Sequence, residues 1–537
     1  MKKIAYYIIL CTLPLCTFSC RPLGDDLLSY GQTDTNAYAQ AGNSFAGEFK
    51  TLWLAMNENY GIWDYEEAKG LNWDAVYATY LPKFEALDDT LLHKTKVTDA
   101  ELKALYEQFL DSLHDGHLMV QIFNRHTNKY IEIVPSKARN LRERAKEMED
   151  EGEDNATNLD YYRALSPSNP LCAGACDAVD AKFIVVEEMD TVCSRLVRAA
   201  DIYIAGVDNA GGPDKYNDSL YSAVKKVRST AQYIRKNADK ARESDEDFAA
   251  MIFVYNNMCS AYDLVGTQLD VNMPTIEESL TGDELEFIAS AVFNGGIAYL
   301  RFGGFALTSY LDKPAPDDTT SLVYAYHTAV NRVWHNWFDT IQTLHANGQL
   351  GGVIIDVRNN EGGAIEDYAY VLGALLPSGN FSSHYLRVKN GTGRLDFAPV
   401  VPFEFPTYTG AHAVIKDEPI VVLANIHSNS MAEMTTFGVK SLPNGHFIGT
   451  RTWGGLSALL DAPAAYSQTY SGCFGVKDVT PVYGFVPRYV ALFGEDMHVL
   501  EGVGITPDEV VPLDVNQWKS AKRDNQLEAA LKYIRSK

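Results

Sequence analysis

The sequence predicts a layered α/β domain in its C-terminal half, with a helical module in front of it. After about residue 286, short β-branched runs alternate with helix-length segments, which is typical of strands and helices in alternate layers. Between residues 46 and 135, apolar residues recur at helical spacing. The chain has 537 residues, 46% of them hydrophobic and 22% charged, and this globular composition is long enough for several domains.

The first 20 residues are predicted to be an export signal. Lys2 and Lys3 precede an apolar run that is too short to span a bilayer as a mature helix, and small residues lead to Cys20. Ser19 and Cys20 resemble a bacterial lipoprotein processing site, at which the cysteine receives the lipid. We therefore expect an exported cell-envelope lipoprotein of the outer membrane, facing the periplasm or the surface, whose only membrane attachment is the lipid. A secreted protein is the alternative.

The segments that follow differ in composition. Residues 21–45 are polar with little periodicity and suit a tether, and residues 46–135 form the helical N-terminal module. An acidic insert of unpredicted fold occupies residues 136–285, and the α/β core occupies residues 286–537.

Within the insert, the charged residues 137–160 indicate a solvated helix and loop, whereas 182–188 and 202–208 resemble strands. In the core, the expected strands are 297–305, 352–358, 419–426 and 446–452, and the expected helices are 323–346, 365–376 and the segment after Ser430.

The net charge argues against two classes of partner, and the cysteine content limits the disulfides and metal sites that the chain can form. The formal charge is −24, from 46 basic and 70 acidic residues, which argues against a nucleic-acid partner or an anionic membrane surface. Cys172 and Cys176 can form a short-loop disulfide, but they lack the second ligand pair that a zinc site requires. Outside the signal and Cys20, five cysteines remain, so we expect at least one free thiol. No metal or organic cofactor is expected.

Two glycines follow a predicted strand in the segment DVRNNEGGAIED, residues 356–367. At a strand-to-helix turn, Gly362 and Gly363 let backbone amides point outward, where they can stabilise an oxyanion. The alternative is a tight turn with no chemical role. A phosphate loop is excluded, because the pattern G-x-x-x-x-G-K-[ST] is absent.

Ser430 ends the predicted strand 419–426 and its turn, and two roles for it stay open. As a nucleophile it would need a base, and the amide of Met431 would supply an oxyanion donor. As a helix cap it would form a capping box with Glu433, through the common pattern Ser-x-x-Glu. The local chemistry favours the cap, so the rest of the chain has to decide.

A candidate base lies far away in the segment DSLHDGHLMV, residues 111–120. It holds His114 and His117, and Gly116 allows a sharp turn just before His117. Histidine is the side chain most often used as a general base near neutral pH. Only folding can bring either histidine to Ser430.

Five motifs in this order resemble the tail-specific (C-terminal-processing) serine peptidases, and most closely their tricorn-core-like branch. They are D-G-H-L, then I-I-D-x-R-x-N-x-G-G, then S-x-A-E after a strand, then 448-IGTRTWGG-455, then 501-EGVGITPDEVVPL-513. The resemblance covers roughly residues 46–135 and 290–515. It implies a crotonase/ClpP-like core of repeated β-β-α units and proteolysis by a serine nucleophile, with a peptide or protein as substrate.

The resemblance assigns roles to individual residues. Ser430 falls on the nucleophile, His117 on the general base, and Gly362 or Gly363 with the amide of Met431 on the oxyanion hole. A serine–lysine dyad is excluded, because Gly455 occupies the position 25 residues after Ser430 that carries the lysine.

Two acidic residues stay open for orienting His117, namely Glu501 and Glu433. The chain also departs from the family pattern, because residues 136–285 show no carboxylate-binding loop of a PDZ domain. We therefore predict a serine endopeptidase of unassigned specificity and oligomeric state. The alternative is a non-catalytic peptide- or ligand-binding lipoprotein on the same fold.

Overall fold

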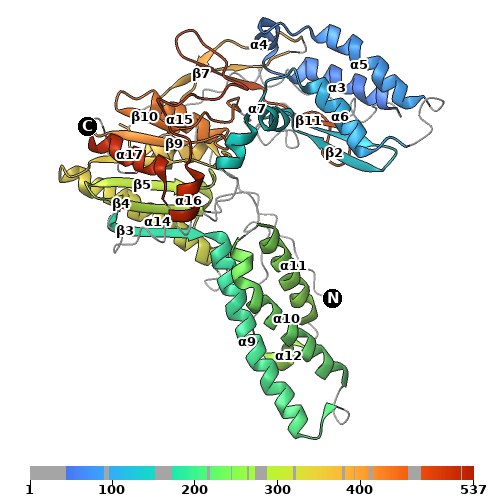
Figure 1. Cartoon of the computed structure of the whole chain (residues 1–537), viewed down its shortest axis with the longest axis vertical. Coiled ribbons are helices and arrows are strands. Elements are labelled where there is room, and N and C mark those ends of the chain that lie inside the picture. Colours follow the sequence, from blue (N-terminus) through green and yellow to red (C-terminus); the bar gives the residue numbers. More distant parts are fainter. Residues whose placement is uncertain are drawn as a thin grey trace.

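A sheet of seven strands forms the centre of the molecule, in the order β13-β10-β9-β6-β5-β4-β3 (Figure 1). Strands β5, β6, β9, β10 and β13 pair in parallel, and β3 and β4 extend the sheet in antiparallel fashion. Their bounds are β3 Cys172–Asp180, β4 Phe287–Phe293, β5 Ile297–Phe302, β6 Gly352–Asp356, β9 Ile420–Ala424, β10 Gly445–Gly449 and β13 Glu509–Val510. A parallel-rich sheet between helices confirms the predicted α/β class; the finer β-β-α repeat stays a prediction.

This computed structural model describes residues 44–89, 96–151, 172–213, 218–243, 245–262, 265–271, 287–317, 322–377, 381–391, 393–410, 415, 417–457, 473–521 and 523–537. The predicted signal, tether and lipidated Cys20 lie outside these residues. The side chains of Cys172 and Cys176 also lie outside them, and the disulfide between them stays a prediction. Cys193, on a helix of the insert, is a free thiol.

Helices cover both faces of the central sheet. Every residue of β6 and β9 is buried, as expected for parallel strands that are covered on both sides. On β9, Val422 packs with α14 (Leu322–Ala346) and α15 (Met431–Lys440), whereas its neighbour Val421 packs with α16 (Val515–Ala521) and α17 (Asn525–Arg535). The alternation of side chains along each strand therefore produces two apolar layers. The helix predicted at 365–376 is a short 3₁₀ turn, Ile365–Asp367, followed by a π-type turn, Ala369–Gly373.

The N-terminal module is helical as predicted, and it also holds a small sheet. Its helices share an aromatic core that includes Phe49, Trp63 and Phe109. They are α3 Phe45–Asn59, α4 Trp63–Ala68, α5 Trp73–Asp88 and α6 Asp99–Leu110. Strand β1 (Met119–Asn124) pairs with β2 (Lys129–Ile133) and with β11 (Val482–Phe485), so a C-terminal strand completes the module. A third sheet joins β12 (Tyr489–Phe493), β7 (His384–Val388) and β8 (Val401–Pro402).

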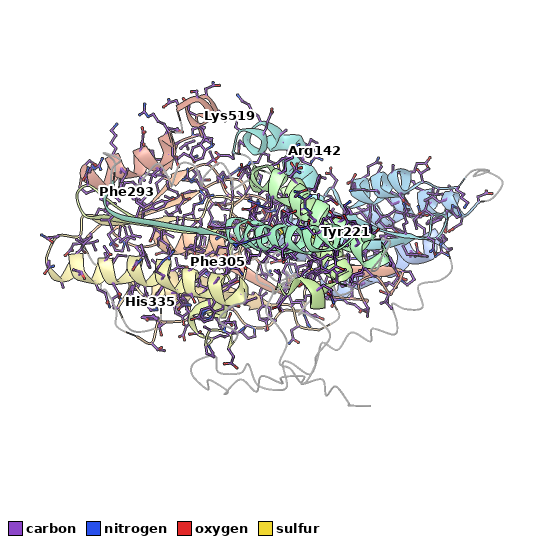
Figure 2. The ribbon with its side chains drawn as sticks, turned by 90° about the horizontal axis from the view of Figure 1, so that it is seen from below. Arg142, Tyr221, Phe293, Phe305, His335 and Lys519 are labelled. Atoms are coloured by element: carbon purple, nitrogen blue, oxygen red, sulfur yellow. The ribbon has the colours of Figure 1, made fainter. Side chains whose placement is uncertain are left out.

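The insert forms a helical arm that projects away from the central sheet (Figure 1). The arm comprises α9 (Ala181–Asn209), α10 (Asp218–Glu243), α11 (Asp245–Tyr262) and the short α12 (Gly266–Leu269), whereas β3, from the same insert, joins the central sheet. In Figure 2, which is seen from below, the arm with Tyr221 points toward the viewer. The strand-like interpretation of 182–188 and 202–208 is wrong, because both lie inside α9. Buried Val185, Met189 and Val192 recur there at helical spacing, and packing overrides their β propensity.

Helix α7 (Pro135–Glu151) differs from the solvated helix predicted for residues 137–160, as far as the described part extends. Several of its polar side chains are buried, among them Arg139 and Arg144. Figure 1 shows α7 between the N-terminal module and the central sheet. Over the described ranges, the helices lack the combination of length and apolar composition that crossing a membrane demands.

Candidate active site

Ser430 is the residue before helix α15, and its backbone is strained. Its φ is 53° and its ψ is −119°, a combination that glycine tolerates and other residues rarely adopt. Its hydroxyl makes no capping hydrogen bond to the helix. The Glu433 carboxylate accepts hydrogen bonds from Thr452 Oγ1, at 2.5 Å, and from the amides of Gly454 and Gly455 instead of closing a box. The capping-box interpretation is therefore wrong, and the hydroxyl stays unengaged by the helix.

Neighbouring loops hold the strained serine in place. The Ser430 amide donates to Asn429 Oδ1 at 2.8 Å and to the Gly455 carbonyl at 3.1 Å. The Asn429 amide donates to the Asn360 carbonyl at 3.0 Å, which ties the serine to the glycine turn after β6. Backbone strain of this kind costs about 1–3 kcal/mol and persists only where the surroundings enforce it.

The paired glycines lie directly against the serine. A Cβ on Gly362, whose φ is 103°, would stand 2.5 Å from Ser430 Cβ and 2.9 Å from the Met431 amide nitrogen, so no side chain fits there. The Gly362 amide donates to Asn360 Oδ1 at 2.9 Å. Across the described chain, the amides of Gly363 and Met431 have no acceptor. Two unused amides thus flank the serine, as an oxyanion hole requires.

Folding brings the loop of His117 to this place. A Cβ on Gly116 would stand 2.3 Å from both the Gly454 carbonyl oxygen and Gly455 Cα, so the two loops touch backbone to backbone. A Cβ on Gly455 would stand 3.3 Å from His117 Cε1. Because the Gly455 carbonyl also accepts from the Ser430 amide, His117 and Ser430 both lie against Gly455.

The His117 ring is half-buried and uncharged near neutral pH. Burial lowers its pKa to about 4, because the cation loses solvation. Its Nδ1 is buried and has no hydrogen-bond partner within the described residues. Asp115 Oδ1 fixes the backbone instead, since it accepts from the amides of His117 at 2.8 Å and Leu118 at 3.0 Å. A neutral imidazole is the form that a general base needs.

The structure does not bring Glu501 or Glu433 to the His117 ring. Glu501 Oε2 accepts from the Gly116 amide at 2.8 Å, and Oε1 accepts from the amides of Leu456, at 2.7 Å, and Ser457. Glu501 therefore ties the histidine loop to the loop after β10, and Glu433 fastens the same loop to α15. Both carboxylates therefore bind backbone of the loops around Ser430 and His117.

Three buried carboxylates behind His117 have raised pKa values. Burial raises the pKa of Glu433 to about 7, and it also raises that of Glu501. Burial, followed by repulsion from Glu501, raises the pKa of Asp115 well above its usual range. These groups are at most 1% exposed, and main-chain amides supply most of their hydrogen bonds. Burial therefore makes each of these three carboxylates harder to ionise than it is in water.

His114, the other histidine of this segment, has a different partner. Its Nδ1 lies 2.6 Å from Glu66 Oε2, and its amide donates to Glu66 Oε1 at 2.7 Å. Tyr60 also donates to Glu66 Oε1, at 2.7 Å. His114 thus anchors the loop to α4 and does not serve as the base.

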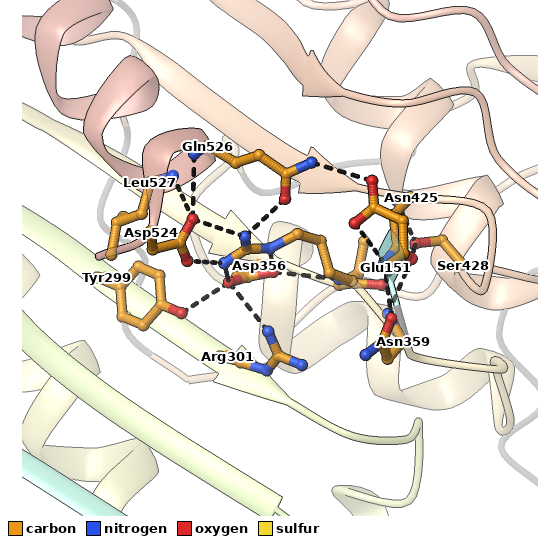
Figure 3. Close-up of polar contacts among 12 residues, drawn as sticks. Glu151, Tyr299, Arg301, Asp356, Asn359, Asn425, Ser428, Asp524, Gln526 and Leu527 are labelled. Atoms are coloured by element: carbon orange, nitrogen blue, oxygen red, sulfur yellow. Dashed lines mark hydrogen bonds and ion pairs between the residues drawn. The ribbon is translucent and has the colours of Figure 1, made fainter. Parts of the chain in front are cut away.

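A buried ionic network at the end of β6 was not predicted (Figure 3). The Arg358 guanidinium donates to Asp356 Oδ1 at 2.9 Å and to Asp524 Oδ1 at 2.9 Å, and also to Gln526 Oε1 at 2.8 Å. Asp356 receives a further hydrogen bond from Tyr299, and its pKa lies well below its usual range because two arginines outweigh the effect of burial. The D-x-R spacing on β6 was the available signal, but its partners on α17 lie 166 and 168 residues away.

Trp453 is a second residue that the sequence prediction missed. Its backbone amide donates to the Ser428 carbonyl at 3.0 Å, and its Nε1 donates to the Gly116 carbonyl at 3.3 Å. It therefore links the serine loop to the histidine loop. As for metals, the described part of the chain groups no three His, Cys, Asp or Glu side chains as ligands.

Part of the chain resembles a known family of peptidases. Residues 297–466 match the model of peptidase family S41. A nisin-resistance protein of Lactococcus lactis subsp. lactis is 31% identical over 122 residues, which are 22% of this chain and 36% of that relative's length. The chain therefore covers 36% of the length of this curated relative.

Solved structures show weaker likenesses. A putative peptidase from Parabacteroides merdae ATCC 43184 has a TM-score of 0.43 and 15% identity, covering 92% of this chain and 97% of that one. The tricorn protease has a TM-score of 0.27 and 17% identity, covering 45% of this chain and 18% of that one. The match of residues 297–466 to peptidase family S41 agrees with the resemblance to tail-specific peptidases that the ordered motifs indicate.

Proposed function

We propose that this protein is a serine endopeptidase in which Ser430 is the nucleophile and His117 is the general base. The observation that carries the proposal is the conformation of Ser430. A strained serine before a helix, with an unengaged hydroxyl and unused amides beside it, suits acyl transfer and has no use as a cap.

The proposed mechanism runs through a covalent intermediate. His117 accepts the Ser430 proton as the oxygen attacks the peptide carbonyl, and the amides of Gly363 and Met431 stabilise the oxyanion. Protonated His117 then donates to the leaving amine. Water attacks the acyl-enzyme with the same base, and Ser430 is regenerated. Gly363 is the preferred glycine, because the Gly362 amide already donates to Asn360.

Cleavage assays test this proposal with the form that lacks residues 1–20. The substrates are a denatured protein and a peptide library, and Ser430→Ala and His117→Ala are compared with the parent. We expect each substitution to lower kcat by several orders of magnitude, on the order of 10⁶-fold for a serine nucleophile. A fluorophosphonate probe should label the parent at Ser430. No turnover and no labelling in the parent would favour the non-catalytic binding protein.

We also propose that the protein is an envelope lipoprotein anchored at Cys20. The support is the order of the two lysines, the apolar run and the Ser19-Cys20 pair. Metabolic labelling with a fatty-acid analogue should mark the parent and leave Cys20→Ala unlabelled. Label on Cys20→Ala at the parent's level would contradict the anchor.

A further inference from the structure

Helix α7 carries a row of buried polar side chains although its composition is that of a solvated helix. Ser136 is 0% exposed, Arg139 7%, Asn140 4% and Arg144 5%. Arginines are rarely buried to this extent without a partner, because the cation loses its solvation. The partners of these side chains therefore show what α7 does.

One end of α7 holds the loop that carries His117. Ser136 Oγ donates to the Gly116 carbonyl at 3.0 Å. Arg139 Nη1 donates to the Leu113 carbonyl at 2.7 Å, and its Nη2 donates to the His114 carbonyl at 3.2 Å. Three carbonyls just before His117 thus point at one helix.

Further along, α7 holds the loop that packs against both Ser430 and His117. Arg144 Nη1 donates to the Thr452 carbonyl at 2.8 Å, and Nη2 donates to the Arg451 carbonyl. The backbone of α7 leaves the helical region at Arg144, with φ −131° and ψ 23°. Burial lowers the pKa of Arg144, so the position is costly for a cation, and Glu147 on its outer side offsets only part of that cost.

We propose that Arg139 and Arg144 are positioning residues that make α7 a brace between the His117 loop and the 451–455 loop. The planar guanidinium of arginine can donate to two carbonyls at once, which a lysine ammonium does less rigidly. With the two loops clamped together, His117 is held against Gly455 and kept from water. This inference rests on the proposed function for its catalytic meaning, but the brace itself can be measured without turnover.

The first test is the titration of His117 in the form that lacks residues 1–20. Histidine labelled with ¹³C at Cε1 is followed by NMR, and His117→Ala assigns the signal. In Arg144→Leu, water should reach the ring and the pKa should rise from about 4 toward the ordinary 6.5. Arg144→Lys should give a smaller rise. Arg142→Ala is the matched control, because Arg142 lies on the same helix but is exposed, and its partners among the described residues are Asp111 and Glu143.

The outcomes separate the brace from a merely structural role. A His117 pKa in Arg144→Leu equal to that in Arg142→Ala, with both proteins folded, overturns the inference. If Arg144→Leu does not fold, Arg144→Lys and Arg139→Lys decide by the same titration. A raised pKa in either supports the brace, and unchanged values in both overturn it.

Kinetics give the second test. Relative to Arg142→Ala, Arg144→Leu should lower kcat on a short peptide by about tenfold or more, with KM changed by less than about threefold, because orientation is lost rather than binding. A raised KM with an unchanged kcat would mean that α7 contacts substrate, and would overturn the brace. A parent that neither turns over nor labels at Ser430 contradicts the proposed function alone, and the titration still decides the brace.

Discussion

Ser430 has a backbone that a residue with a Cβ adopts only under strain. Its φ of 53° and ψ of −119° lie in a sparsely populated region that costs an L-residue about 1–3 kcal/mol. The surrounding loops bear this cost through the hydrogen bonds of the Ser430 amide to Asn429 and Gly455. The strained backbone therefore lowers the stability of the fold at this residue, and its hydroxyl makes no capping hydrogen bond to α15.

The strain predicts an order of stabilities. Ser430→Gly should be more stable than Ser430→Ala by about 1 kcal/mol in urea unfolding, because only alanine keeps the strained Cβ. Both variants should be inactive. At Ser441, whose φ is −80° and ψ −12°, the order should reverse, because that backbone is ordinary for alanine. Equal stabilities of the two Ser430 variants would argue against strain.

His117 predicts how activity and stability respond to acid. A folded-state pKa of about 4 lies below the ordinary 6.5, so folding favours the neutral ring. The stability contributed by this group is present above pH 6.5 and is lost as the pH falls from 6.5 toward 4. The acid limb of kcat/KM should therefore lie near pH 4, and His117→Ala should lose less unfolding free energy between pH 7 and pH 5 than the parent does. An acid limb near pH 6.5 would contradict the lowered pKa of His117.

At the scale of elements, two loops meet without side chains between them. A methyl group on Gly116 would collide with the backbone of Gly454 and Gly455, which flexible atoms cannot relieve. Gly116→Ala should therefore separate the loops and lower kcat/KM by about 10²-fold while the protein stays folded. Gly206→Ala is the control, because open space surrounds it in α9, and it should raise stability by about 0.5–1 kcal/mol without changing activity. Activity in Gly116→Ala equal to that of the control would refute this contact.

Asp524, the N-cap of α17, also pairs with the buried Arg358. Asp524 accepts from the amides of Gln526 and Leu527 and from the Arg358 guanidinium. Asp524→Asn keeps a good cap but removes the charge, so we expect a loss of about 3 kcal/mol in urea unfolding. Asp514→Asn caps α16 without a buried cation and should cost no more than about 0.5 kcal/mol. A similar small loss in both would show that the ionic network contributes little.

Elements with local sequence signals were predictable from the sequence, whereas contacts between distant segments were not. The strand at 352–358 was predictable, because a continuous apolar run is a local signal. The helix after Ser430 was also predicted, although the capping box expected at its start is not formed. The ordered motifs singled out Ser430, His117 and the paired glycines, which the fold brings close to Gly455 and to one another, and their catalytic roles stay predictions. The partners of Glu501 and Arg358 were not, because they lie hundreds of residues away and only folding selects them. Helix α7 misled the prediction because charged residues buried against carbonyls look like solvated ones in a sequence.

At the scale of the molecule, the helical arm enters and leaves the core through adjacent ends. Asp180 of β3 pairs directly with Phe287 of β4 in antiparallel register, and the arm connects these two residues. A two-residue Asn-Gly turn suits such a junction. Replacing residues 181–286 with Asn-Gly should therefore leave a folded core with kcat/KM on a short peptide within about threefold of the parent.

The same excision tests what the arm does. Unchanged cleavage of a denatured protein would restrict the arm to a structural role, and a selective loss on that substrate would assign it to substrate recruitment. Circular dichroism and unfolding in urea serve as controls for the fold. A variant that loses short-peptide cleavage while remaining folded would contradict the independence of the core.

The hydrogen bond from the Gly116 amide to Glu501 affects when the histidine loop can form during synthesis of the chain. The two residues are 385 positions apart, so the histidine loop acquires its anchor only after Glu501 has been made. At ordinary synthesis rates this separation corresponds to roughly 20–80 s. Strand β11 and its partner β1 impose the same delay on the N-terminal module. A newly made chain therefore keeps the His117 loop without this anchor until residue 501 has been made.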